Sequence, residues 1–304
     1  MRSVRLAPDG KTLATGSQDK TVSIWSMATW ARERALPLSG AVNSLAFSPD
    51  STLLAIGSSD DKIGLWSTAT WECTRSLSQP HRIRMGVNAV AFAADGGRLA
   101  WASGDNTVAI CDTATWEVVH WFTHTCPVYS VAFSPDGKVL AGGTDDDTGA
   151  VWDAVTWERE LPLTHSHYVN DVVFSPDSRA LASASMDRSV GMWEMGTWQR
   201  KLTLAHSEAV MCVAIGSDGH TVVSGTADGC VVVWNTITLE RNGILRGHSG
   251  SVRAVAFSGC GRYVVSASDD GTCIVWEKPS FLASFGLSIK KCFSRKEKVK
   301  IYAL

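Results

Sequence analysis

Long apolar runs are missing from this sequence. The longest apolar stretches have the length of a strand, so no membrane-spanning helix is predicted. Residues 1–5 lack the apolar core of a signal peptide. The net charge is only −2 over 304 residues, which excludes electrostatic nucleic-acid binding by the chain as a whole. Tyrosine is scarce, with 4 residues against 13 tryptophans, and this bias indicates that one position recurs along the chain.

Metal-binding and catalytic motifs are also missing. The eight cysteines contain no C-x-x-C pair, and none lies near a histidine pair at zinc-binding spacing. We therefore expect reduced, buried thiols in a cytoplasmic or nuclear protein. The sequence has no phosphate-binding loop, no dinucleotide fingerprint and no Gly-x-Ser-x-Gly turn. It consequently predicts no cofactor, no metal ion and no enzymatic activity.

A repeat of 41 to 45 residues is what the sequence does contain. Each unit has an aspartate six residues before an anchor position, and the anchor is tryptophan in every unit but one, which has Cys111. Seven matches at a fixed offset exclude chance. The aspartates are Asp19, Asp60, Asp105, Asp146, Asp187, Asp228 and Asp270, and the tryptophans are Trp25, Trp66, Trp152, Trp193, Trp234 and Trp276.

Each unit has the pattern of four short strands separated by turns. Turn-forming sequences such as residues 134–137 (SPDG) follow the first apolar segment. Apolar residues alternate with a period of two before the anchor, as Val22 and Ile24 do, which favours strands over helices. The fourth segment is polar in several units, for example residues 158–160, and we expect it to form the outer edge of each sheet.

The recurring histidine, aspartate and tryptophan at these offsets resemble the WD-repeat family. The resemblance covers residues 1–287 and implies an all-β fold, a seven-bladed β-propeller of four-stranded antiparallel blades around a central channel. Blades of this kind stack into a ring because a single blade cannot bury both faces of its sheet. Residues 288–304 would then form a basic C-terminal tail, which we expect to be disordered.

The resemblance also implies a hydrogen-bonded tetrad in each blade. In this family a histidine, a serine or threonine, the turn aspartate and the anchor tryptophan bond to one another, because a buried carboxylate requires donors. A Ser-His-Asp set could suggest a hydrolase, but a set that occurs three times serves the repeat and not one catalytic centre. The three complete tetrads are His165-Ser183-Asp187-Trp193, His206-Ser224-Asp228-Trp234 and His248-Ser266-Asp270-Trp276.

Other units depart from this pattern. The fourth unit has His124 but places Gly142 at the serine position. The second unit has Leu38 and Ile56 at the histidine and serine positions, and the third keeps only Asp105. We therefore expect blades 2 and 3 to lack the tetrad.

A rigid disc of this kind would bind partners through its loops. Blades 4 to 6 would present tyrosine and methionine side by side at the top rim, and both are enriched in interface cores. The alternative is a few scattered exposed apolar residues, which are common on any protein. The candidate partner-binding residues at the rim are Tyr129, Tyr168, Asn170, Met186, Met211 and Arg253.

An insertion between Leu77 and Val87 is a second candidate surface. It carries Arg82 and Arg84 and would stand above blades 2 and 3. Arginines in such a loop could meet an acidic or phosphorylated partner. The alternative is a surface insertion that the fold tolerates.

A second aromatic column lies five residues after the anchor. Its regular recurrence predicts a structural role, in which each ring packs on the neighbouring blade. Its members are Trp30, Trp71, Trp116, Trp157 and Trp198, followed by Leu239 and Phe281.

The two ends of the repeat bear on how the ring closes. Propellers of this family usually close with an N-terminal segment that supplies the outer strand of the last blade. Here residues 3–6 match an innermost strand, and Phe281 and Leu287 match the fourth strand of the last blade. We therefore expect every blade to be continuous in sequence, with the seam between blades 1 and 7 held by packing.

The basic tail and the repeat together give the functional expectation. Residues 290–300 (KKCFSRKEKVK) carry six basic residues and one acidic residue, so the tail could be a nuclear-localisation signal, a nucleic-acid contact or a solvated end. We expect a non-catalytic cytoplasmic scaffold or adaptor for other proteins or peptides, with no membrane partner and no small-molecule substrate. The alternatives are a regulatory or sensor module of a larger multidomain protein, and a nuclear subunit of RNA processing or ribosome assembly.

Overall fold

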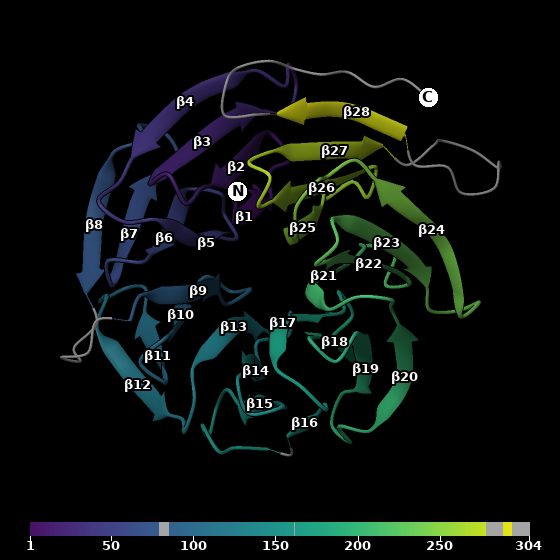
Figure 1. The fold of residues 1–304 in the computed structure, drawn as a ribbon. Helices are drawn as coiled ribbons and strands as arrows, with labels where there is room; N and C mark the ends of the chain where they lie inside the picture. The colour runs from purple at the N-terminus through teal and green to yellow at the C-terminus, as the bar shows by residue number, and fades with distance from the viewer. Residues whose placement is uncertain (79–84, 161, 278–287, 294–304) are drawn as a thin grey trace.

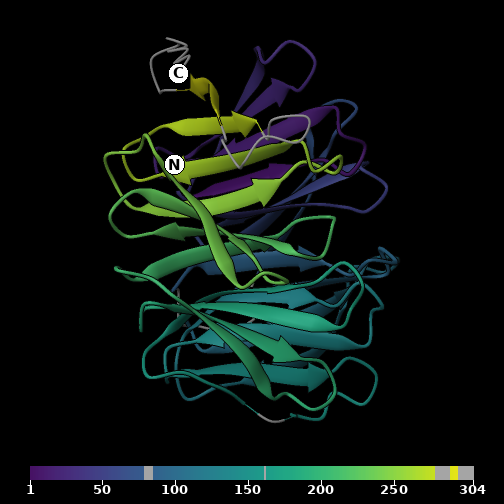
Figure 2. The same ribbon diagram turned by 90° about the vertical axis from the view of Figure 1, so that its right-hand side faces the viewer.

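The protein forms a ring of seven sheets. The computed structural model describes residues 1–78, 85–160, 162–277 and 288–293. Within these residues each sheet has four antiparallel strands, and the sheets are arranged around a central axis (Figure 1). The side view shows the sheets stacked one on the next (Figure 2). The predicted seven-bladed propeller is therefore confirmed. The described residues contain no helix long and apolar enough to cross a membrane.

In every blade the strands follow one another in chain order from the axis outward. Blade 1 contains β1 (Ser3–Leu6), β2 (Thr12–Gly16), β3 (Thr21–Ser26) and β4 (Arg32–Pro37). Blade 2 contains β5 (Val42–Phe47), β6 (Leu53–Ser58), β7 (Lys62–Ser67) and β8 (Cys73–Ser78). Blade 3 contains β9 (Val87–Phe92), β10 (Arg98–Ser103), β11 (Thr107–Asp112) and β12 (Val118–Thr123). Blade 4 contains β13 (Val128–Phe133), β14 (Val139–Thr144), β15 (Thr148–Asp153) and β16 (Leu163–Thr164).

The last three blades repeat this order. Blade 5 contains β17 (Val169–Phe174), β18 (Ala180–Ser185), β19 (Ser189–Glu194) and β20 (Arg200–Ala205). Blade 6 contains β21 (Val210–Ile215), β22 (Thr221–Thr226), β23 (Cys230–Asn235) and β24 (Glu240–Arg246). Blade 7 contains β25 (Val252–Phe257), β26 (Tyr263–Ser268), β27 (Cys273–Glu277) and β28 (Ser288–Phe293).

The hydrophobic core lies between the sheets and not inside one central cluster. Buried side chains form a cluster at each junction of neighbouring blades, as where Ile24 of blade 1 meets Leu54 of blade 2. The period-two alternation of each strand sends its side chains to both faces, and each face is covered by the adjacent blade. The ring thus buries both faces of all its sheets.

The seam between blades 1 and 7 closes without a shared strand in the described residues, as the sequence predicts. Val4 and Trp25 of blade 1 pack against Val265 of blade 7. The structure adds one contact that the sequence did not predict, because the backbone nitrogen of Met1 donates a hydrogen bond to the carbonyl of Ser268 at 2.8 Å.

The predicted domain boundary at residue 287 is wrong, because β28 lies within residues 288–304. Strand β28 pairs with β27 in antiparallel register, with Glu277 opposite Ser288. Residues 278–287 separate these two strands, whereas only residues 27–31 separate β3 from β4, so a fixed offset from the anchor misplaces the last strand. Phe281 and Leu287, which were assigned to it, lie outside the described residues.

The outer strand of blade 4 also differs from the expectation. Residues 158–160 contribute only an isolated bridge between Arg159 and Trp152, and the strand itself is the short β16. Pro162 directly precedes β16 and has no N–H to donate, which explains why the ladder does not extend through this segment.

The cysteines are less uniformly buried than expected. Cys230 and Cys273 are buried in strands, whereas Cys73 on the outer strand β8 and Cys260 in the turn before β26 are exposed. Outer strands and turns are the parts of a blade that no neighbouring sheet covers.

The second aromatic column packs on the preceding blade, as predicted. The ring of Trp30 meets the ring of Tyr263 edge-on, with centroids 5.3 Å apart across the seam. The indole of Trp198 in blade 5 donates to Glu160 in blade 4. Each of the five tryptophans has a positive φ, between 53° and 63°, which is unfavourable for a residue other than glycine. The packing of the ring offsets this cost.

Candidate functional site

Two of the three predicted tetrads form in full. In blade 5 the Nε1–H of Trp193 donates to Ser183 Oγ at 2.7 Å, which lies 2.7 Å from His165 Nε2. The other ring nitrogen, His165 Nδ1, lies 2.8 Å from Asp187 Oδ2. The hydrogen bonds therefore run in one direction from indole to hydroxyl to imidazole to carboxylate.

Blade 7 repeats the arrangement with Trp276, Ser266, His248 and Asp270. Burial lowers the pKa of His165, so its imidazole is neutral at physiological pH. Burial alone would raise the pKa of Asp187, but hydrogen bonds from Ser189 and His165 hold that pKa below its ordinary value. These groups are fully engaged in holding strands together.

The third predicted tetrad, in blade 6, is wrong in one member, because no hydrogen bond joins Asp228 to His206. The Nδ1–H of His206 donates instead to the carbonyl of Leu204 at 2.9 Å, and its Nε2 lies 2.7 Å from Ser224 Oγ. The indole of Trp234 reaches His206 Nε2 at 3.3 Å.

The residue two positions after the aspartate explains why blades 5 and 6 differ. In blade 5 the hydroxyl of Ser189 occupies Asp187 Oδ1 and leaves Oδ2 for the histidine. In blade 6 this position is Cys230, whose thiol lies 3.4 Å from Asp228 Oδ2, while Thr226 occupies Oδ1. Both carboxylate oxygens are therefore taken within the turn.

Blades 2 to 4 contain buried polar atoms without a hydrogen-bond partner among the described residues. Three of them, namely Trp66 Nε1, Asp105 Oδ2 and His124 Nε2, belong to a tetrad position whose partner is replaced. Burial lowers the pKa of His124 to about 4. Blades 2 to 4 therefore lack a complete tetrad in the described part of the chain, as the sequence predicts.

The predicted tyrosine and methionine residues of blades 4 to 6 lie at the opening of the ring or next to a residue that does. Tyr129 and Met211 are the second residues of the innermost strands β13 and β21, and both line the opening on the ring axis. The N–H of Met186 donates to the carbonyl of Tyr168 at 2.9 Å. Burial, Asp145 and the neighbouring Tyr168 raise the pKa of Tyr129 to about 12. We call Tyr129, Tyr168, Met186 and Met211 the rim surface.

Two other predicted rim residues are engaged within the ring. The Nδ2–H of Asn170 donates to the carbonyl of Val210 in the next blade at 2.8 Å. Asn43 and Asn88 make the same contact to their next blades, so this column joins innermost strands. The Nε–H of Arg253 donates to Asp269 at 2.7 Å. The recurrence of asparagine at one repeat position was the sequence signal for this role.

The second candidate surface cannot be placed, since Arg82 and Arg84 lie outside the described residues. Next to them, Met85 is 57% exposed, and the N–H of Gly86 donates to Asp61 at 2.6 Å. No group of three or more metal-ligating side chains occurs among the residues that the structure describes.

The sheet order, the sevenfold ring and the tetrads of blades 5 and 7 define a β-propeller built from sequence repeats. The chain belongs to the WD40 family. The family model for the WD domain, G-beta repeat, matches seven segments that together cover most of the chain. Propellers of this family are commonly protein-interaction scaffolds. The matched segments are residues 1–26, 34–67, 71–112, 116–153, 159–194, 198–235 and 239–277.

Most of these segments begin just before the outer strand of one blade and end with the third strand of the next blade, so the sequence repeat is offset from the structural blade. A comparison with curated proteins finds no similar sequence at the significance required.

Proposed function

We propose that this protein is a non-catalytic scaffold or adaptor that binds other proteins through the rim surface. The supporting observation is that Tyr129 of blade 4 and Met211 of blade 6 line the mouth of the ring, and that Tyr168 of blade 5 neighbours Tyr129. Tyr168 is 38% exposed, and Tyr129 and Met211 are partly exposed beside the axis. Tyrosine and methionine are the residue types that interface cores favour.

The strands beneath the rim surface are joined from blade to blade by hydrogen bonds, and a surface that is ordered before binding lowers the entropic cost of binding. Asn170 lies between Tyr168 and the next blade, and its amide bonds blade 5 to blade 6. Its Nδ2 also lies 3.9 Å from the sulfur of Met211. Tyr129 and Met211 thus lie on strands, and Tyr168 and Met186 lie directly beside a strand end.

The test is the double variant Tyr129→Ala/Tyr168→Ala. Tagged wild-type and variant proteins are used for affinity capture with mass spectrometry, and each captured partner is then titrated against the purified propeller. Two tyrosines in an interface core carry about 1–2 kcal/mol each, so we expect affinity to fall about tenfold or more. Circular dichroism should stay unchanged.

The matched control is Ile237→Ala/Leu239→Ala. These two side chains are 65% and 60% exposed and lie in the outer turn between β23 and β24, away from the rim. We expect the control to keep its partners and their affinities. Wild-type affinity in the tyrosine variant, or an equal loss in both variants, would refute the proposal.

A further inference from the structure

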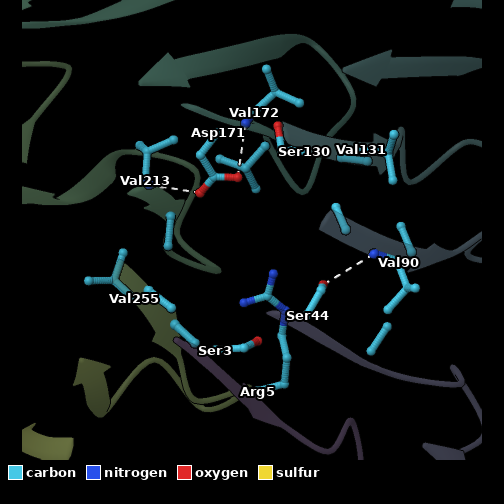
Figure 3. Close-up of a pocket in the computed structure, with 18 of the residues that line it drawn as sticks. Ser3, Arg5, Ser44, Val90, Ser130, Val131, Asp171, Val172, Val213 and Val255 are labelled. Carbon is cyan, nitrogen blue, oxygen red and sulfur yellow. Dashed lines mark hydrogen bonds between the residues drawn. The ribbon is translucent and has the colours of Figure 1, made fainter. Parts of the chain in front are cut away.

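A cavity lies on the axis of the ring. It has a volume of about 440 Å³ and is lined by the innermost strands of all seven blades (Figure 3). Pockets of this size hold small organic ligands. The cavity must exist in any ring of seven blades, so its presence alone says nothing about a ligand, and the side chains that line it carry the argument.

The seven blades can be compared at each position that lines the cavity. Arg5 on β1 lines the cavity at a position that is small and apolar in the other six blades. Because six blades form without a charge here, the fold does not require one at this position. The corresponding residues are Ala46, Ala91, Ala132, Val173, Ala214 and Ala256.

Asp171 on β17 is the only carboxylate among the described residues that line the cavity. It faces Arg5 from the opposite wall (Figure 3). One oxygen accepts the N–H of Val213 in the next blade at 3.0 Å, and the other accepts the N–H of Val172 at 3.0 Å. No ion pair joins it to Arg5 among the described residues. The guanidinium and the carboxylate therefore lie on opposite walls of the cavity without direct pairing.

Two further arginines lie at the same cavity. Arg253 is paired with Asp269, but the Nε of Arg2 is buried without a hydrogen-bond partner among the described residues. The lining thus holds three arginines and one aspartate in a chain whose net charge is −2. A buried guanidinium N–H without an acceptor is costly, and an anion would supply that acceptor.

Arg5 keeps most of its donors for such an anion. One of its terminal nitrogens donates to the carbonyl of Val4 at 2.9 Å, and a guanidinium has five N–H groups in all. The hydroxyl groups of Ser3, Ser44 and Ser130 also line the cavity.

We propose that the axial cavity binds a small organic anion, whose carboxylate or phosphate group is held by Arg5 and Arg2. The position of Asp171 across the cavity favours an anion that also carries hydroxyl groups, because a carboxylate accepts hydrogen bonds from them. The cavity shares Tyr129 and Met211 with the rim surface, but binding of such an anion requires no protein partner.

The test is calorimetric titration of the purified protein at low salt with three probes, namely inorganic phosphate, citrate and ribose 5-phosphate. We expect saturable binding of at least one probe with one ligand per chain. Binding of citrate alone would assign the site to carboxylates, and binding of either phosphate probe alone would assign it to phosphates.

The decisive variant is Arg5→Ala. Alanine already stands at this position in five blades, so the variant should fold as the wild type does. Loss of charge-assisted hydrogen bonds should weaken binding about tenfold or more. Arg34→Ala, which removes the same charge from the exposed outer strand β4, should leave the affinity within about twofold. Absence of saturable binding for all three probes, or equal affinity in Arg5→Ala, would overturn the proposal.

Discussion

Replacing Asp171 with serine should stabilise the protein at neutral and alkaline pH. Asp171 joins blade 5 to blade 6 by accepting the N–H of Val213. Serine does the same at this repeat position in other blades, where Ser3 accepts the N–H of Leu45 at 3.2 Å and Ser44 accepts that of Val90 at 3.1 Å. Asp171→Ser therefore keeps the contact between blades and removes a charge from the interior of the ring.

The size of the effect follows from the pKa of Asp171. Burial raises this pKa to about 6 from an ordinary value of 3.8. The folded state therefore holds the proton of Asp171 more tightly than the unfolded state. The contribution of Asp171 to the free energy of unfolding is largest below about pH 4 and is lost as the pH rises through 6. Two pKa units correspond to about 3 kcal/mol, and solvent that enters the cavity reduces this to about 1–2 kcal/mol.

Urea unfolding at intervals from pH 4 to pH 8 measures this difference. We expect Asp171→Ser to exceed the wild type by about 1 kcal/mol at pH 8, after allowing for the lost bond from Val172, and to show no gain at pH 4. Asp171→Asn is the contrast, since its amide must face one of two N–H donors and should gain less. Parallel curves for wild type and Asp171→Ser across this pH range would refute the reasoning.

Two further predictions concern the tetrads and the seam. Asp187→Ala removes the acceptor of His165 and of the Ser166 N–H, and each loss should cost about 1–3 kcal/mol of stability, whereas Asp228→Ala disturbs only its own turn. The midpoint of urea unfolding should therefore shift clearly more for Asp187→Ala, and equal shifts would contradict the different hydrogen bonding of blades 5 and 6. Trp30→Ala removes the ring that packs on Tyr263, so it should lower the stability by about 2–3 kcal/mol and speed amide exchange in β1. The control Leu239→Ala changes an exposed residue at the same repeat position and should cost less than about 0.5 kcal/mol, and unchanged exchange in β1 of Trp30→Ala would show that Trp30 does not hold the seam.

The ring was predictable because its determinants recur. The turn aspartate and the anchor tryptophan stand at fixed offsets, and each copy confirms the others. The prediction failed where a copy changes its spacing, as in the longer connection before β28. No anchor residue follows Trp276, so the sequence pattern could not reveal the extra residues that precede the last strand.

The site was harder to predict, since hydrogen bonding depends on competition between nearby donors. His206 and Asp228 are at the correct offsets, but Cys230 and Thr226 satisfy the carboxylate first. The sequence places Asn170 at the rim, because the pattern of one strand does not show how the innermost strands of neighbouring blades are aligned. Arg5 could have been found, since it is the single arginine in a column of small apolar residues.

Continuity of each blade in sequence has a consequence for folding during synthesis. The four strands of blade 1 leave the ribosome before any residue of blade 2, and each pairs with a neighbour that has just been made. No early strand has to wait, unpaired and open to aggregation, for a partner at the far end of the chain. The last event is the docking of two finished surfaces, where Val4 and Trp25 meet Val265, and this step costs one long loop closure and no rearrangement of backbone hydrogen bonds.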